Sequence, residues 1–187
     1  KAEQQYLLNN ISANAKVLDI GCGEGRNMMT IYQKTPFVWG IDHDQKAIDD
    51  ALKNFEDKET VTIIKAEADK LPFENESFDV VIMFHILYNL DHKKIDTLKE
   101  SFRVLKSNGK LFISNYSDFA LDTRLEMYKR IGAYNDITKT DVTKLYFYNV
   151  VSEQFSKEQI VELGELVGFK ISDCQKVGDL AYICTYI

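Results

Sequence analysis

Short apolar runs alternate with longer segments whose apolar residues recur at helical spacing over the first two thirds of the chain. The apolar runs predict strands at 16–20, 37–42, 61–65, 78–83 and 110–114. The intervening patterns predict helices over about 24–34, 45–57 and 93–106, with a turn at Ser107-Asn108-Gly109 before the fifth strand. This alternation predicts an α/β fold with a largely parallel sheet.

The last third has a different pattern. Residues 116–150 are rich in Tyr and charge and show no clean alternation, apart from a predicted helix near 121–131. A helix over 156–167 follows, ended by Gly168, and strands are predicted at about 169–175 and 180–187. Because Gly178-Asp179 is a hairpin-like turn signal, we expect an antiparallel ending and one unbroken domain over 1–187.

Composition narrows the class of protein. The 187 residues are 45% apolar, enough for one sizeable core, and no run approaches the ~18–20 apolar residues of a membrane span. The balance of 23 basic against 29 acidic residues argues against a protein that wraps nucleic acid. The chain begins at Lys1 rather than Met, so residues can precede it.

Three cysteines, at 22, 174 and 184, form no C-x-x-C pair. We therefore expect neither a disulfide framework nor a zinc site. A reducing, cytoplasmic location fits this cysteine usage best.

The segment 17–27, VLDIGCGEGRN, carries the clearest chemical signal. Gly21, Gly23 and Gly25 allow the backbone to turn sharply out of a strand and to approach a ligand at a helix start. Their spacing is G-x-G-x-G and not the G-x-G-x-x-G of dinucleotide binders. Taken alone, the segment also fits a glycine-rich turn that binds nothing.

Asp42 ends the second predicted strand, downstream of the glycine loop. A carboxylate at this place can accept both hydrogen bonds from a ribose diol, as in nucleoside and dinucleotide sites. The alternative is a solvated acid in the turn Asp42-His43-Asp44, where Asp44 caps the next helix.

With further ordered motifs, the sequence resembles the class I S-adenosylmethionine-dependent methyltransferases. The family signatures are similar to VLDIGCGEG (17–25), to AEADKLPF (66–73) with ESFDVV (76–81), to RVLKSNGK (103–110) and to the late helix ending in Gly168-Phe169. The resemblance implies a Rossmann-like, doubly wound, seven-stranded, mostly parallel sheet with one antiparallel C-terminal strand and helices on both faces. It divides the chain into a donor-binding half (about 15–115), a substrate-side insertion (about 116–155) and a C-terminal helix and β-hairpin (about 156–187).

The resemblance also implies the cofactor, S-adenosylmethionine, and roles for individual residues. Asp42 is expected to bind the ribose, and Glu67, a departure from the family's Asp, the adenine amino group. Ala68 would offer its backbone N–H to the adenine ring. The full set expected at the donor is Asp19, Gly21, Cys22, Gly23, Gly25, Arg26, Asp42, His43, Glu67, Ala68, Met83 and Phe84.

For several of these residues the sequence also allows a second role. Asp19 can attract the donor's ammonium or only accept backbone N–H groups at the turn, and Arg26 can meet its carboxylate or stay exposed. His43 can pack beside adenine or face water. Cys22 is expected to pack rather than react.

The acceptor is expected beyond the fourth strand, at the carboxyl end of the sheet. No Asn/Asp-Pro-Pro-Tyr and no Pro-Cys motif is present, which argues against amino-methylation of adenine or glutamine and against cytosine C5 methylation. His85 is the best candidate for a general base and Tyr88 the second candidate for a catalytic residue, although the reaction can also proceed without either. Tyrosines that could roof the acceptor are Tyr6, Tyr116, Tyr128, Tyr134, Tyr146 and Tyr148.

The leading hypothesis is methyl transfer to an O, N or S atom of a small-molecule acceptor by in-line displacement. The alternatives are a non-catalytic donor-binding sensor or partner subunit, and a nicotinamide-dependent oxidoreductase. We expect no membrane or nucleic-acid partner and no metal, and either a monomer or a homodimer.

Overall fold

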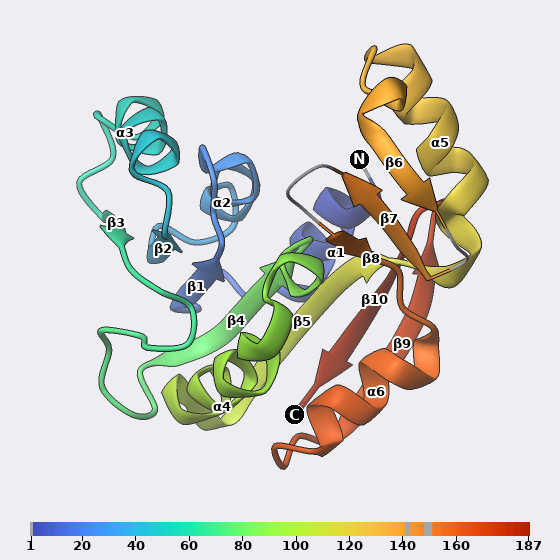
Figure 1. Cartoon of the computed structure of the whole chain (residues 1–187). Helices are drawn as coiled ribbons and strands as arrows, with labels where there is room; N and C mark the ends of the chain where they lie inside the picture. Colours follow the sequence, from blue (N-terminus) through green and yellow to red (C-terminus); the bar gives the residue numbers. More distant parts are fainter. Residues whose placement is uncertain (1, 141–142, 148–150) are drawn as a thin grey trace.

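A central sheet of seven strands organises the computed structural model, which describes residues 2–140, 143–147 and 151–187 (Figure 1). The strand order is β3-β2-β1-β4-β5-β10-β9. Only β10 runs against its neighbours, so the prediction of one antiparallel strand in a doubly wound sheet is confirmed. The strands are β1 (Val17–Ile20), β2 (Val38–Asp42), β3 (Val61–Lys65), β4 (Phe78–Phe84), β5 (Leu105–Tyr116), β9 (Ile171–Val177) and β10 (Ala181–Tyr186).

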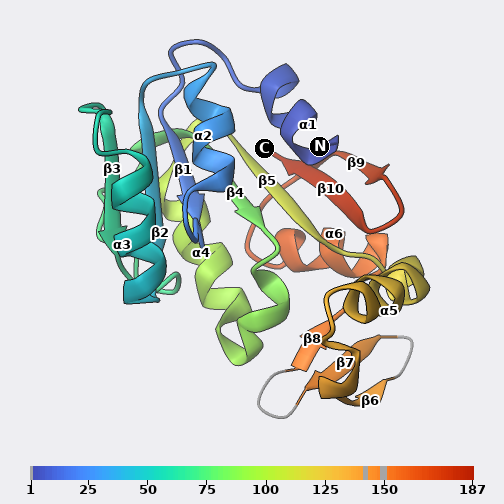
Figure 2. The same cartoon turned by 90° about the horizontal axis from the view of Figure 1, so that it is seen from above.

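Helices cover both faces of this sheet (Figure 2). On one face α1 (Ala2–Asn10), α2 (Arg26–Tyr32) and α3 (Gln45–Asn54) share one apolar core with the strands. On the other, α4 (Lys94–Val104) and α6 (Lys157–Glu165) share the second core. Successive side chains of β4 alternate between the two cores, which is why its sequence is apolar at nearly every position.

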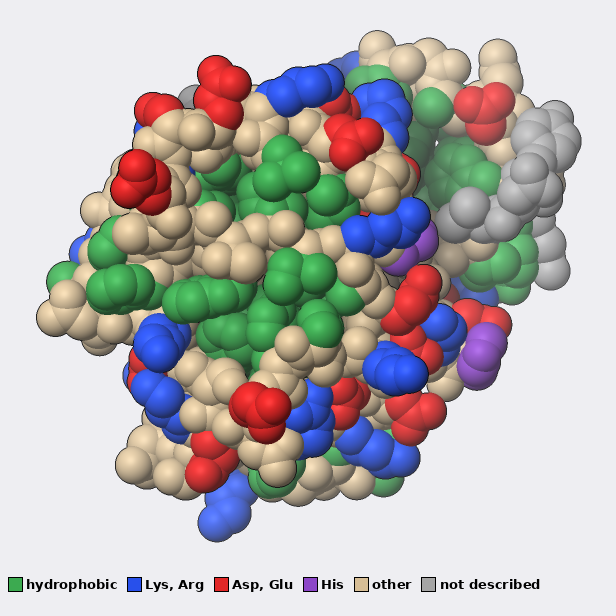
Figure 3. All heavy atoms as spheres, turned by 90° about the vertical axis from the view of Figure 1, so that its left-hand side faces the viewer, with side chains coloured by type: hydrophobic (Ala, Val, Ile, Leu, Met, Phe, Trp, Pro, Cys, Tyr) green, Lys and Arg blue, Asp and Glu red, His purple; other side chains and the backbone are tan. Residues whose placement is uncertain are grey.

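The edge strand β3 is less completely covered than the central strands. Its residues from Val61 to Ile64 are half-buried, whereas β1 is buried throughout. Figure 3 shows hydrophobic side chains gathered on the face of the molecule that carries β3 and α3. The side chains of the central strands are therefore buried, whereas those at this edge of the sheet are partly exposed to solvent.

The predicted turn at 107–109 is wrong, because β5 begins at Leu105 and continues through these residues. Its pairing with β4 jumps from Phe78↔Leu105 to Val80↔Lys110. The residues between Leu105 and Lys110 outnumber those opposite them on β4, so they form a bulge-like irregularity within β5.

Residues 116–155 contain more structure than the sequence pattern predicted. After the predicted helix, α5 (Leu121–Arg130), comes an antiparallel sheet of β6 (Ile137–Thr140), β7 (Lys144–Phe147) and β8 (Val151–Glu153). Strand β8 packs against the 3-10 turn Leu87–Asn89, which follows β4. The small sheet thus lies next to the carboxyl end of β4 (Figure 1).

The expectation that the chain has no disulfide is wrong. Cys174 on β9 lies directly opposite Cys184 on β10, and the two form a disulfide. The pairing arises from strand register, which no C-x-x-C spacing reveals. Cys22 is free and buried. Among the described residues, no helix is both long and apolar enough to cross a membrane.

Gly164 provides a test of the packing between α6 and the sheet. Any Cβ at this position would overlap the Tyr186 ring, lying 2.8 Å from its Cδ1 atom. We expect Gly164→Ala to lower the free energy of unfolding by about 1–3 kcal/mol, even though alanine favours helix by ~1 kcal/mol. Urea unfolding measures this change. Glu165→Ala, at the exposed neighbouring position, should have little effect, and a Gly164→Ala protein as stable as wild type would contradict the packing.

Candidate functional site

The glycine loop between β1 and α2 lies across the carboxyl ends of the first two strands. Gly21, Gly23 and Gly25 have φ angles of 73°, 55° and 88°, in the left-handed region that favours glycine. The Gly21 N–H donates to the Ile41 carbonyl at 2.8 Å. A Cβ at Gly23 would meet no atom within 4 Å, so the loop leaves open space beside its backbone there.

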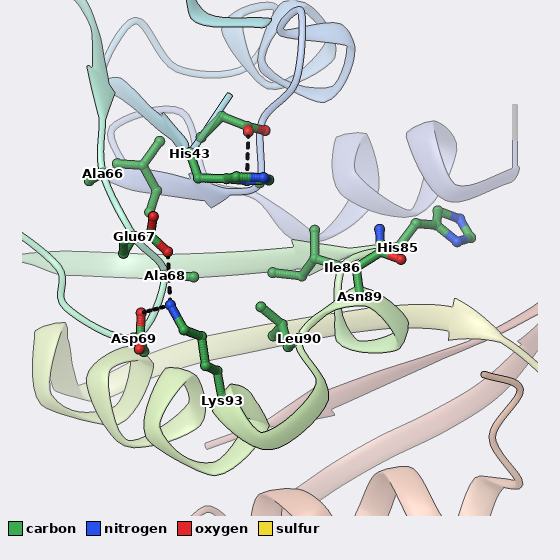
Figure 4. A pocket seen from close by; sticks show the side chains of 13 residues that line it. His43, Ala66, Glu67, Ala68, Asp69, His85, Ile86, Asn89, Leu90 and Lys93 are labelled. Atoms are coloured by element: carbon green, nitrogen blue, oxygen red, sulfur yellow. Dashed lines mark hydrogen bonds and ion pairs between the residues drawn. The ribbon is translucent and has the colours of Figure 1, made fainter. Parts of the chain in front are cut away.

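A cavity of about 240 Å³ lies beside this loop, at the carboxyl ends of β2, β3 and β4 (Figure 4). Its position matches the switch point of the sheet, where β1 pairs with both β2 and β4. It is lined by Gly21, Ile41, Asp42, His43, Ala66, Glu67, Ala68, Asp69, His85, Ile86, Asn89, Leu90 and Lys93. Six predicted site residues meet here: Gly21, Asp42, His43, Glu67, Ala68 and His85.

Asp42 is held in place by the backbone around it. Its Oδ2 accepts the Gly23 N–H at 2.9 Å, and its Oδ1 accepts the Asp44 N–H at 3.0 Å. The His43 ring lies beside it, with Nδ1 3.3 Å from Oδ1, while most of that side chain faces water. Asp44 caps α3 through the Lys46 N–H, as its sequence position predicts. The glycine loop and the acid at the end of β2 therefore form one hydrogen-bonded unit.

Lys93 lies at the opposite wall of the cavity, a position that no motif in the sequence indicates. Its Nζ lies 3.0 Å from Glu67 Oε2 and 3.2 Å from Asp69 Oδ1 (Figure 4). These two hydrogen bonds raise the pKa of Lys93. The Glu67 side chain is 60% exposed, so it can still accept a hydrogen bond from a ligand.

Asp19 is a buried carboxylate beneath the loop. It is only 1% exposed, and among the described residues neither of its oxygens has a hydrogen-bond partner. Burial, and then the negative charge of Asp42, raise its pKa well above the usual value, while the charge of Arg26 opposes them. Such an uncompensated acid suits a cationic ligand nearby.

The other predicted donor residues lie around the cavity without lining it. Burial and the charges of Asp19 and Asp42 raise the pKa of the Cys22 thiol, which suits a packing role. Met83 packs towards α4 and accepts a hydrogen bond from the Ser101 hydroxyl at 3.3 Å. Three further residues complete the set. Gly25 precedes α2, and Arg26 is the first residue of that helix. Phe84 packs in the core on the α1 side of the sheet.

His85, at the end of β4, is held by a helix that the sequence did not predict. Its backbone has a φ of 60°, rare for a residue other than glycine. Its Nε2 lies 2.8 Å from Glu3 Oε1 on α1, which also accepts the Ser114 hydroxyl. Its Nδ1 is buried and has no hydrogen-bond partner among the described residues. Burial alone would raise the pKa of Glu3, but the bonds from His85 and Ser114 and the charge of Arg26 bring it below its usual value.

An aromatic cluster adjoins His85. The centre of the Tyr116 ring lies 4.9 Å from the centre of the His85 ring and 5.4 Å from the centre of the Tyr88 ring. Burial, and to a lesser extent the neighbouring Tyr116 and Tyr128, raise the pKa of Tyr88 to about 12, so its phenol is protonated at neutral pH.

The remaining tyrosines that were expected to roof an acceptor are scattered. Tyr146 lines a second cavity and Tyr128 packs against Phe147, whereas Tyr134 is exposed. Tyr6 lies elsewhere, bonded to Thr185 on β10, and Tyr148 lies outside the described residues.

The second cavity, of about 610 Å³, lies between the turns after β4 and the small sheet. It shares His43 and Asn89 with the first cavity, so the two adjoin. Its lining comprises His43, Tyr88, Asn89, Asp91, Lys94, Lys144, Tyr146, Val151 and Glu153.

The buried Asp19 predicts a pH-dependent cost in stability. Because folding raises its pKa, the native protein keeps this proton to higher pH than the unfolded chain, and stability falls as pH rises above about 4. Asp19→Asn should therefore raise the melting temperature of the ligand-free protein at pH 8 by at least ~2 °C, and less near pH 4. Differential scanning calorimetry checks this, with the exposed Asp179→Asn as control. A lower melting temperature at pH 8 would refute the assignment.

Comparison with known proteins places this geometry in a family. The model of the methyltransferase domain matches residues 18–113, which hold the glycine loop and the three acids of the first cavity, Asp42, Glu67 and Asp69. A protein of Haemophilus influenzae is 32% identical over 151 residues, covering 77% of this chain and 60% of its own. The ubiquinone/menaquinone biosynthesis C-methyltransferase of Chromobacterium violaceum is 35% identical over 113 residues, covering 58% and 46%. The chain thus spans about half to three fifths of these two relatives.

Solved structures agree on the fold. The PH0226 protein from Pyrococcus horikoshii superposes with a TM-score of 0.77 at 26% identity, covering 99% of this chain and 87% of its own. A SAM-dependent methyltransferase from Methanosarcina mazei has a TM-score of 0.73 at 20% identity, covering 97% and 95%. The chain belongs to the class I S-adenosylmethionine-dependent methyltransferase family.

Proposed function

We propose that this protein transfers the methyl group of S-adenosylmethionine to a nucleophilic atom of a small-molecule acceptor. The observation that supports this proposal is the meeting of the glycine loop, Asp42 and Glu67 in one cavity that adjoins a second, larger one. One cavity would hold the donor and the other the acceptor. The nucleophile would be O, N or S, and the C-methyltransferase relatives add an acidic carbon to this set.

The residues present fit this donor, which carries a sulfonium cation, an ammonium, a carboxylate and a ribose. Asp19 is a buried acid without a partner among the described residues, as a cationic ligand requires. Asp42 would accept from the ribose hydroxyls, and Glu67 from the adenine amino group. Arg26 would meet the carboxylate. When bound, the donor supplies an activated methyl group whose leaving thioether is neutral.

The segment 116–155 would form the acceptor side, as a substrate-side insertion on the donor-binding half. Its strands β7 and β8 supply Lys144, Tyr146, Val151 and Glu153 to the second cavity. A volume of about 610 Å³ suits a small molecule.

His85 would act as the general base when the acceptor must lose a proton. Its Nε2 is engaged by Glu3, which leaves Nδ1 as the nitrogen able to take that proton. Glu3 would position the ring and stabilise the imidazolium that forms, as a carboxylate does for histidine in other enzymes. Tyr88, protonated at neutral pH, would donate a hydrogen bond rather than accept a proton.

Donor binding tests the role of Asp42. A net loss of about 1.5–3 kcal/mol, the contribution of one charge-assisted hydrogen bond, should weaken S-adenosylmethionine binding by Asp42→Ala roughly 10- to 100-fold. Isothermal titration calorimetry measures the dissociation constant. Asp44→Ala, which removes a helix cap two residues away, should change it less than about threefold. Equal losses in the two variants would contradict the ribose assignment.

The base is tested by paired substitutions of His85 and Glu3. Asn tolerates the left-handed backbone at position 85, so His85→Asn should leave donor binding intact and lower kcat by about 10²- to 10⁴-fold for a hydroxyl, amine or thiol acceptor. Glu3→Gln should lower kcat less and leave KM nearly unchanged. S-adenosylhomocysteine release over an acceptor screen provides the assay. Full activity of His85→Asn would rule out the base, and donor binding without any release by wild type would favour a sensor.

A further inference from the structure

Arg124, on α5, is a buried cation without a counter-ion among the described residues. Its side chain is 0% exposed. Its Nη2 donates to the Ser152 hydroxyl at 2.7 Å and lies 3.4 Å from the Tyr128 hydroxyl. Within the described part of the chain, Nε and Nη1 have no hydrogen-bond partner, and no carboxylate forms an ion pair with this guanidinium. Arginine is rarely buried in this way unless it is paired.

The groups around Arg124 are neutral and compensate its charge only in part. Its Cζ lies 3.9 Å from the centre of the Tyr116 ring and 5.9 Å from that of Tyr128. A cation–π contact of this kind stabilises a buried cation by less than the removal of that cation from water costs. A negatively charged partner from outside the chain would compensate the rest.

The aromatic cluster links Arg124 to the proposed acceptor cavity. Tyr116 contacts Arg124, and its ring packs 5.4 Å from that of Tyr88, which lines the cavity. The same Tyr116 ring lies 4.9 Å from His85. Arg124 therefore lies one layer of side chains behind the cavity wall and close to the proposed base. Access from the cavity to Arg124 therefore requires the Tyr88 and Tyr116 rings to rotate, and side-chain rotations of this kind are common on binding.

The rest of the cavity wall carries charges of both signs among its described residues. Lys94 and Lys144 both pair with Glu153, at 2.7 Å and 3.2 Å. The other acid of the lining, Asp91, is 93% exposed. The donor cavity is more acidic, with Asp42, Glu67 and Asp69 in its lining against Lys93. An anionic ligand is therefore better accommodated on the side of the second cavity, where Arg124 lies behind the wall.

We propose that the methyl acceptor carries a carboxylate and that Arg124 binds it. This inference rests on the proposed methyl transfer. A single guanidinium matches the single charge of a carboxylate, and the Nε and Nη1 N–H groups provide charge-assisted hydrogen bonds. The acceptor class is then a small acid that bears a hydroxyl, amine, thiol or acidic carbon elsewhere in the molecule.

Benzoate and its neutral isostere benzamide test the anion site without knowledge of the acceptor. With S-adenosylhomocysteine present, benzoate should bind saturably and shift the ¹⁵N signal of Arg124 Nε, whereas benzamide should bind at least tenfold more weakly. Arg124→Lys should weaken benzoate binding at least tenfold. Arg130→Met, at an exposed position on the same helix, should leave it unchanged. Equal affinity for the two probes, or no saturable benzoate binding, would overturn the inference.

Thermal stability separates a binding role from a structural one. If Arg124 binds an anion, Arg124→Met should have a melting temperature at or above that of wild type without benzoate. Adding benzoate should not raise the melting temperature of this variant. If Arg124 only holds α5 to β8, Arg124→Met should melt lower and wild type should not respond to benzoate, which would overturn the inference. If S-adenosylhomocysteine does not raise the melting temperature of the wild-type protein in the same experiment, the proposed function would be overturned instead.

Discussion

The parallel pairing of β1 with both β2 and β4 is the constraint on which the rest of the site depends. Val17 pairs with Val38 on one side and with Val80 on the other, so three carboxyl ends lie side by side. The chain leaves β1 and β2 towards helices on one face of the sheet and reaches α4, on the other face, after β4. The space between these connections becomes the cavity, and Gly21, Asp42 and His85 are among the residues that line it.

Two buried groups of opposite charge flank this cavity system. Asp19 lies beneath the glycine loop and Arg124 lies behind the aromatic cluster, each without an ionic partner among the described residues. Uncompensated buried charge lowers the stability of a ligand-free protein, and binding of a ligand of opposite charge restores it. Under the proposed function, the stability lost at both places would be regained when a cationic donor and an anionic acceptor bind next to each other.

Residues predicted from the sequence were those whose role depends on local geometry. Gly21, Gly23 and Gly25 are recognisable because a left-handed backbone after a strand requires glycine. Asp42 is recognisable because the last residue of a parallel strand lies at the ligand-binding edge. Both signals need only a few neighbouring residues and the order of the strands.

The sequence by itself determined the alternating strands and helices from β1 to β5, the antiparallel ending, and the acids Asp42 and Glu67 that line the first cavity, because periodicity and short motifs encode them directly. Only the tertiary structure brought Glu3 to His85, Lys93 to Glu67 and Cys174 to Cys184. Each of these contacts joins separate elements, and their partners are fixed by helix docking and strand register rather than by spacing along the chain. Arg124 shows the same limit, since its burial depends on α5, β5 and β8 packing together around one side chain.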